Sequence, residues 1–189
     1  WMPLRATGVE AFLRDHPDYD GRGVLIAILD SGIDPGVPGL GTTTTGDRKI
    51  LDLRDFSGEG RVALSPVTLI GESVRAGGRV LNGLSRLRAL MVGTTGYAGG
   101  IAERPLGEMP ASDLNGDGDD RDTLGVVVAR LTDGWAVFAD SDGDGSLADE
   151  SPVRDYLRGR DTFGWRRGTG PSPITVAVNL RDSASIPQL

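Results

Sequence analysis

The chain has 189 residues and a net charge of −7, and 38% of its residues are apolar. This length suits one domain, or one domain and part of another, and the apolar content is enough for a core. The acidic charge disfavours nucleic acid and anionic membranes as partners. The chain has no cysteine, which excludes disulfides and thiolate metal sites, and no apolar run approaches the roughly 20 residues of a membrane span.

A short helix is predicted near the N-terminus. Thr7 and Glu10 have the spacing of a capping box, in which each side chain bonds a backbone N–H at the start of the helix. Pro17 ends the helix because proline cannot continue it. His16 is the single histidine of the chain and lies between acidic residues at this helix end. We interpret His16 as a solvated loop residue.

Residues 24–29 are six consecutive apolar residues, a pattern typical of a strand that is covered on both faces. Asp30 follows directly, at the C-terminal tip of this predicted strand. In open α/β sheets, ligands and catalytic groups gather at that end of the strands. The pattern therefore predicts a buried strand in an α/β fold, with the Asp30 carboxylate at its mouth.

Asp30-Ser31-Gly32 and its flanks, from Tyr19 to Leu40, resemble the subtilisin-like serine peptidases (subtilases), and within them the tripeptidyl-peptidase II branch. The resemblance implies that Asp30 is the acid of an Asp-His-Ser triad, which orients a histidine and stabilises its charge. It also implies hydrolysis of peptide bonds, with a peptide or protein as substrate.

In the subtilisin order the acid is followed by the histidine and then by the serine. In this chain His16 precedes Asp30, and neither a His-Gly-Thr-His nor a Gly-Thr-Ser segment follows. We therefore expect the chain to be the N-terminal portion of a longer peptidase, which supplies the triad acid only and is inactive alone.

Short apolar pieces broken by glycine and proline follow the acid segment, and the chain has 29 glycines and 11 prolines. They predict short strands rather than long helices. Residues 49–53 and 174–180 are each predicted as a strand. Asp133-Gly134, between the apolar runs 125–131 and 135–139, predicts a hairpin.

The branch carries a long insertion after its acid, so the resemblance implies a division into three parts. Residues 1–58 would open the catalytic domain, and residues 59–173 would form a β-rich insertion. Residues 174–189 would form a strand and tail that return toward the catalytic domain, although the strand could instead stay in the insertion. The predicted fold class is α/β: the opening part of a subtilisin-like parallel-sheet domain, with an insertion of mostly strands and loops and few helices.

Two acidic loops have the spacing of calcium ligands. Calcium loops place oxygen ligands at positions 1, 3, 5 and 7, with glycine at position 6 and a closing acid at position 12. In both loops position 12 lacks an acid, so Asp149 or Glu150 would close the first, and Asp122 would have to bend in to close the second. The candidate ligands are Asp140, Asp142, Asp144, Ser146, Asp149 and Glu150 in the first loop, and Asp113, Asn115, Asp117 and Asp119 in the second.

Such loops predict structural Ca²⁺ bound weakly, with Kd of order 10⁻⁴–10⁻³ M; solvated acidic turns are the alternative. A different class of function also stays open, namely a non-catalytic, calcium-stabilised β-rich binding module with a chance Asp-Ser-Gly. Calcium loops without cysteine favour a secreted bacterial protein over a cytoplasmic one, although the eukaryotic branch is cytosolic. Oligomerisation is left open by the sequence.

Overall fold

The computed structural model describes residues 3–103, 112–166, 172–183 and 186–188. Contacts divide the chain into two units, Trp1–Ile33 and Asp34–Leu189, and each is described by itself. None of the helices in the described ranges has both the length and the apolar character that crossing a membrane requires.

The Trp1–Ile33 unit contains helix α1 (Val9–Asp15). The predicted capping box is wrong: Gly8, with a φ of 78°, takes the N-cap position, and no side chain caps the helix. The Thr7 hydroxyl donates to the Leu4 carbonyl oxygen instead, at 3.1 Å. His16 follows the helix and stacks on Tyr19, with ring centroids 5.1 Å apart, and both residues are exposed.

The apolar run 24–29 differs most from expectation. It forms no strand, and its large side chains are exposed, from 66% for Val24 to 94% for Leu29. The prediction of a buried strand is therefore wrong for this chain by itself. A strand needs hydrogen-bonding partners and cover on its apolar faces, and no described segment supplies them for this run.

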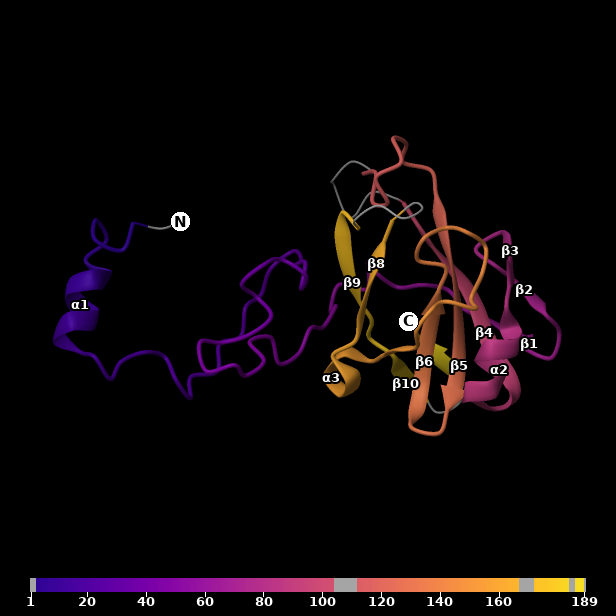
Figure 1. Ribbon diagram of the computed structural model, residues 1–189, viewed down its shortest axis with the longest axis horizontal. Helices are drawn as coiled ribbons and strands as arrows, with labels where there is room; N and C mark the ends of the chain where they lie inside the picture. The colour runs from indigo at the N-terminus through magenta and orange to yellow at the C-terminus, as the bar shows by residue number, and fades with distance from the viewer. Residues whose placement is uncertain (1–2, 104–111, 167–171, 184–185, 189) are drawn as a thin grey trace. The chain divides into compact units, whose positions relative to one another are not determined.

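The Asp34–Leu189 unit is built around a five-stranded antiparallel sheet with strand order β1-β4-β5-β6-β7 (Figure 1). Three two-stranded ladders accompany it, β2–β3, β8–β9 and β10–β11. The described strands are β1 (Ser65–Thr68), β2 (Ser73–Ala76), β3 (Arg79–Asn82), β4 (Met91–Ala102), β5 (Thr123–Leu131), β6 (Gly134–Ala139), β7 (Val153–Arg154), β8 (Thr162–Trp165), β9 (Ile174–Ala177), β10 (Arg181–Ser183) and β11 (Ile186–Gln188).

The predicted α/β class with a parallel sheet is wrong. Every ladder between the described strands is antiparallel, and the parallel pairing among these residues is an isolated bridge between Asn82 and Ser146. Parallel neighbours need crossover connections of a dozen or more residues, usually helical. The helices here, α2 (Leu84–Leu90) and α3 (Tyr156–Gly159), are too short for that role. The chain is mostly β, with few helices.

Strand β5 lies at the centre of the sheet and is covered on both faces. Val127 and Ala129 face a core cluster shared with β2, β3 and α2, whereas Val126 and Val128 face a cluster shared with β8. All four side chains are fully buried. Because neighbouring side chains of a strand point to opposite faces, a continuous apolar run is what such a strand requires.

The predicted hairpin at Asp133-Gly134 is confirmed, because β5 and β6 pair from Val126↔Ala139 to Leu131↔Gly134. The strand predicted over 174–180 is confirmed for β9, which pairs with β8. The strand predicted over 49–53 is wrong, because no ladder includes those residues.

Two distant segments are joined by polar contacts, which we call the Arg54–Asp155 clasp. The two terminal guanidinium nitrogens of Arg54, Nη1 and Nη2, donate to Asp155 Oδ2 and Oδ1, each at 3.3 Å. Asp155 also accepts from the Leu157 and Leu180 N–H groups, at 3.0 and 2.9 Å. Nearby, the Asn179 amide donates to the Leu53 carbonyl oxygen at 2.7 Å. The clasp ties residues 53–54 to the segment that follows β9.

Candidate catalytic acid and cation loops

The Asp30 side chain is exposed and free of ion pairs within the described residues. Its Oδ1 accepts from the Ser31 N–H at 2.7 Å, with the Ser31 hydroxyl at 3.3 Å. These contacts are local to the Asp-Ser-Gly turn, and they leave the carboxylate accessible to a further hydrogen-bond donor. An acid that is to hold an imidazole needs that accessibility.

Asp34 is the second acid after the apolar run, and its contacts are those of a turn residue. Its Oδ1 accepts from the Gly36 N–H at 2.8 Å, the pattern of an Asx turn. A side chain at Gly36 would collide with Thr175 of β9, so glycine permits this close approach. The turn after Asp34 therefore packs against the β-rich part of its own unit.

Both acidic loops begin at one end of the main sheet. Strand β4 ends at Ala102, β5 begins at Thr123, and these two residues pair. Strand β6 ends at Ala139, and the next N–H, that of Asp140, donates to the Gly125 carbonyl oxygen at 3.1 Å. The antiparallel register therefore brings acids from distant parts of the sequence to the same edge of the sheet.

In the first loop, Asp140, Asp142 and Asp144 each offer a carboxylate oxygen, and these oxygens lie within 4.8 Å of one another. Backbone N–H groups hold the side chains in place: that of Gly145 donates to Asp140 at 3.1 Å, and that of Ser146 to Asp144 at 2.6 Å. Converging hard oxygens are the ligands that Ca²⁺ prefers. The three predicted ligands at positions 1, 3 and 5 thus share one place.

Strand β3 anchors this loop to the core. The Asn82 N–H donates to the Gly145 carbonyl oxygen, and the Leu147 N–H donates to the Asn82 carbonyl oxygen, both at 2.9 Å. Leu147 is 1% exposed and belongs to the core cluster shared with β2, β3 and α2. The loop is therefore fixed at its far side by packing and by backbone hydrogen bonds.

Asp140 is an unusual carboxylate because its side chain is completely buried, and its Oδ2 has no hydrogen-bond partner. Burial raises the pKa of this carboxyl, while the Gly145 N–H and Arg79 oppose the shift. A buried charged group without a hydrogen-bond partner is costly. A cation bound to the Asp140 carboxylate would satisfy such an atom.

The other predicted ligands of the first loop lie differently. Asp149 is exposed, and Glu150 accepts from the Ser141 N–H at 2.6 Å and from the Ser141 hydroxyl at 2.9 Å. Burial also raises the pKa of Glu150, against the effect of these two hydrogen bonds. Neither acid joins the cluster of Asp140, Asp142 and Asp144. Their ligand role stays a prediction, as does that of Ser146.

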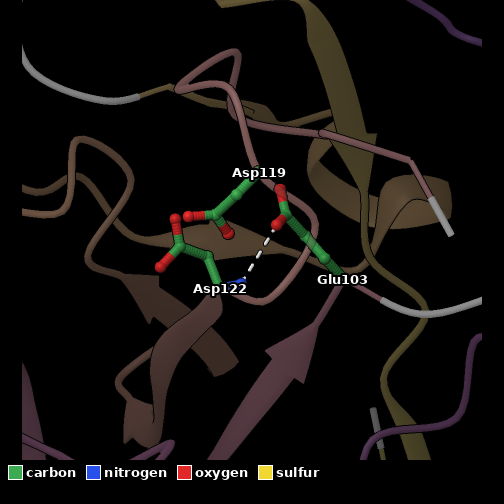
Figure 2. Close-up of side chains that lie close together, drawn as sticks. All are labelled: Glu103, Asp119 and Asp122. Carbon is green, nitrogen blue, oxygen red and sulfur yellow. Dashed lines mark hydrogen bonds between the residues drawn. The ribbon is translucent and has the colours of Figure 1, made fainter.

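The second loop has a different grouping. Figure 2 shows Glu103, Asp119 and Asp122 together, with oxygens within 4.8 Å of one another. Glu103 is 6% exposed, and its carboxylate accepts from the N–H groups of Leu114 and Asp122, at 2.7 and 3.0 Å. Of the predicted ligands, Asp119 is thus brought to a cluster that contains Glu103, which the loop spacing does not reveal.

The remaining predicted ligands of that loop bind its backbone. Asp113 accepts from the N–H groups of Gly116 and Gly118, at 2.6 and 2.8 Å, and Asn115 accepts from that of Asp117 at 2.9 Å. The β4–β5 register brings Glu103 into the cluster: Ala102 pairs with Thr123, so Glu103 lies beside Asp122. That register spans a 20-residue connection, which sequence patterns do not fix.

A small cavity of about 20 Å³ lies between the two loops, lined by Asn115 and Asp122 of one and by Asp140 of the other. Trp165 of β8 forms part of its wall. A space of this size holds a single water or ion, given enough polar partners. Arg79 and Arg166 line it as well, so carboxylates and guanidinium groups meet at this edge of the sheet.

No family model matches the chain, but comparisons with individual proteins find relatives. Tripeptidyl-peptidase 2 from Oryza sativa subsp. japonica is 56% identical over 66 residues, which is 35% of this chain and 5% of that protein. Pyrolysin from Pyrococcus furiosus is 33% identical over 159 residues, covering 73% of this chain and 11% of that protein.

A crystal structure of tripeptidyl peptidase 2 matches with a TM-score of 0.62 at 25% identity, over 93% of this chain and 18% of that one. The chain thus spans only a small part of the length of the relatives it matches. Part of this chain is homologous to part of tripeptidyl-peptidase 2 and of pyrolysin, which are subtilases.

Proposed function

We propose that this chain is the part of a subtilisin-like serine peptidase that carries the triad acid, Asp30, and a cation-stabilised β-rich insertion. The structural match to tripeptidyl peptidase 2 over 93% of the chain carries the proposal. In a protein that holds all three triad residues, the substrate would be a peptide or protein. The homologues are serine peptidases, whereas the chain itself has neither a histidine after Asp30 nor a Gly-Thr-Ser segment.

The exposed apolar run supports this proposal. Leu25, Ile28 and Leu29 are 77–94% exposed directly before Asp30. Burying one such side chain contributes about 1.5–3 kcal/mol, so this run is unfavourable in water and is expected to be covered by other polypeptide. A strand covered on both faces is what the family places before its acid.

A chimera tests the peptidase proposal. The 189 residues would replace the matched 18% of tripeptidyl peptidase 2, and hydrolysis of a chromogenic peptide substrate of that enzyme would be measured. We expect the chimera to hydrolyse the substrate, because Asp30 would stand where the acid of the parent enzyme stands. The 189-residue chain alone is the control and should hydrolyse nothing. A folded chimera without turnover would contradict the proposal.

We further propose the division into residues 1–58, 59–173 and 174–189, as opening segment, insertion and returning segment. The Arg54–Asp155 clasp supports it, because Arg54 lies just before the insertion and the Leu180 N–H lies just after it, and both bind Asp155. An insertion whose two ends are held together can be added to a domain without separating the strands on either side.

A second function, calcium-dependent stabilisation, is favoured by the buried and unpartnered Oδ2 of Asp140. We propose that Ca²⁺ binds Asp140, Asp142 and Asp144, with the carbonyl oxygen of Ser146 and with Asp149 or Glu150 as further ligands. A weaker second site would use Asp119 of the second loop. Sites of this weak class fill only at the millimolar calcium found outside cells, so the proposal favours an extracellular protein.

Calcium should raise the melting temperature of the chain. For Kd of order 10⁻⁴–10⁻³ M, about 10 mM Ca²⁺ adds about 1.4–2.7 kcal/mol to the free energy of unfolding. Melting followed by circular dichroism in EDTA and in Ca²⁺ would measure it. Asp140→Asn should abolish most of the increase, and Asp18→Asn, which removes an exposed acid in the other unit, should keep it. An unchanged melting temperature in Ca²⁺ would exclude the site.

A further inference from the structure

Two arginines lie close to the acids of the first loop. Arg79 of β3 places a guanidinium nitrogen 4.0 Å from Asp140 Oδ2. Arg166, directly after β8, places one 3.8 Å from Asp142 Oδ2. Both arginines line the same small cavity as Asp140. The cluster is therefore opposed by positive charge that the chain itself supplies.

The contact of Arg79 is an incomplete substitute for a ligand. At 4.0 Å its nitrogen is too far for a hydrogen bond, and Asp140 Oδ2 has no hydrogen-bond partner although the side chain is fully buried. The Arg79 side chain is 49% exposed, so turning it into solvent costs little. Arg79 thus partly neutralises the carboxylate without satisfying it.

Arg166 is placed differently, because its backbone N–H donates to the Ser141 carbonyl oxygen at 2.9 Å. This backbone bond keeps Arg166 beside the loop even when its side chain changes conformation. A divalent cation brings twice the positive charge of one guanidinium to the clustered carboxylates, so the charge of Arg79 is no longer needed there once the cation is bound. The loop would not come loose when Arg79 leaves, because Asn82 holds Gly145 and Leu147 through backbone bonds.

We propose that Arg79 is an internal counter-ion of Asp140, which a divalent cation displaces when it binds the loop. This inference rests on the cation site proposed above. Without cation, Arg79 reduces the cost of the buried charge; with cation, the guanidinium turns outward. Arg79 therefore weakens cation affinity and stabilises the cation-free chain. A monovalent ion would not replace it, since it brings no more charge than the guanidinium.

The test compares Arg79→Gln with Arg75→Gln in the full 189-residue chain. Arg75 lies in β2 of the same hairpin, is exposed and has no ion pair within the described residues, so both changes remove one charge from one hairpin. Calcium affinity would be measured by calorimetry, and terbium luminescence excited through tryptophan would serve as a second probe, since Trp165 lines the cavity.

We expect Arg79→Gln to bind Ca²⁺ about twofold to fivefold more tightly, the size of one ion pair near a surface. Its melting temperature in EDTA should fall below that of the parent chain. Arg75→Gln should change neither value appreciably, because solvent and salt screen exposed charges. Arg79→Lys, which keeps the charge, should stay close to the parent in affinity.

The outcomes separate the two proposals. If the parent chain binds Ca²⁺ and Arg79→Gln binds it equally well, the displacement of Arg79 is refuted while the cation site stands. If Arg75→Gln tightens binding as much as Arg79→Gln, the effect is general electrostatics and the specific role of Arg79 is again refuted. If no variant binds Ca²⁺ or terbium, the cation site itself is wrong, and the displacement is wrong with it.

Discussion

Changing Asp30 to asparagine in the chimera with tripeptidyl peptidase 2 should lower kcat for peptide hydrolysis by about 10⁴-fold. The triad acid accepts the N–H of the histidine and stabilises the imidazolium that forms when the serine loses its proton. An asparagine can present an amide N–H at the same place, which favours the wrong imidazole tautomer. The geometry survives the change, so the loss should fall on kcat more than on KM.

Asp34→Asn is the matched control, since it removes an acid four residues away. The asparagine oxygen can still accept from the Gly36 N–H, the contact that Asp34 makes, so kcat should remain that of the parent chimera. Equal losses in both variants would point to a general effect of charge on this segment. Retained activity in Asp30→Asn would remove Asp30 from the triad.

Local signals explain what could be predicted of the fold. The β5–β6 hairpin follows from Asp133-Gly134 between two apolar runs, since turn chemistry and side-chain character act over a few residues. The convergence of Asp140, Asp142 and Asp144 is also local, because alternate residues around glycines such as Gly143 and Gly145, both with positive φ, can point to a common centre.

Pairing between distant segments explains what could not be predicted. Residues 24–29 have the composition of a buried strand, but whether they form one depends on partners that no local pattern supplies, and here they are exposed. Glu103 joins Asp119 and Asp122 only through the β4–β5 register. No local sequence pattern indicates that Asp155 contacts Arg54, which lies more than 100 residues earlier in the chain.

Asp155→Ala should cost about 2–4 kcal/mol of unfolding free energy, because it removes the N-cap of α3 and leaves a second N–H group without its acceptor. Asp155 is 7% exposed. The change would leave the Leu157 and Leu180 N–H groups without their acceptor, and the Arg54 guanidinium without its more deeply buried carboxylate. Urea unfolding of the 189-residue chain, followed by tryptophan fluorescence, would measure the loss.

Asp52→Asn provides the comparison, because Asp52 pairs with the same arginine at 3.0 Å but has a side chain that is 35% exposed. Its asparagine oxygen can still accept from the Leu53 N–H, so the expected cost is within about 1 kcal/mol. Arg54→Met, Asp155→Ala and the double variant would give the interaction energy between Arg54 and Asp155 by a double-mutant cycle.

A cost for Asp155→Ala no larger than that for Asp52→Asn would show that the clasp does not hold the two ends of the insertion together. The proposed boundaries at residues 58 and 174 would then lose their physical support.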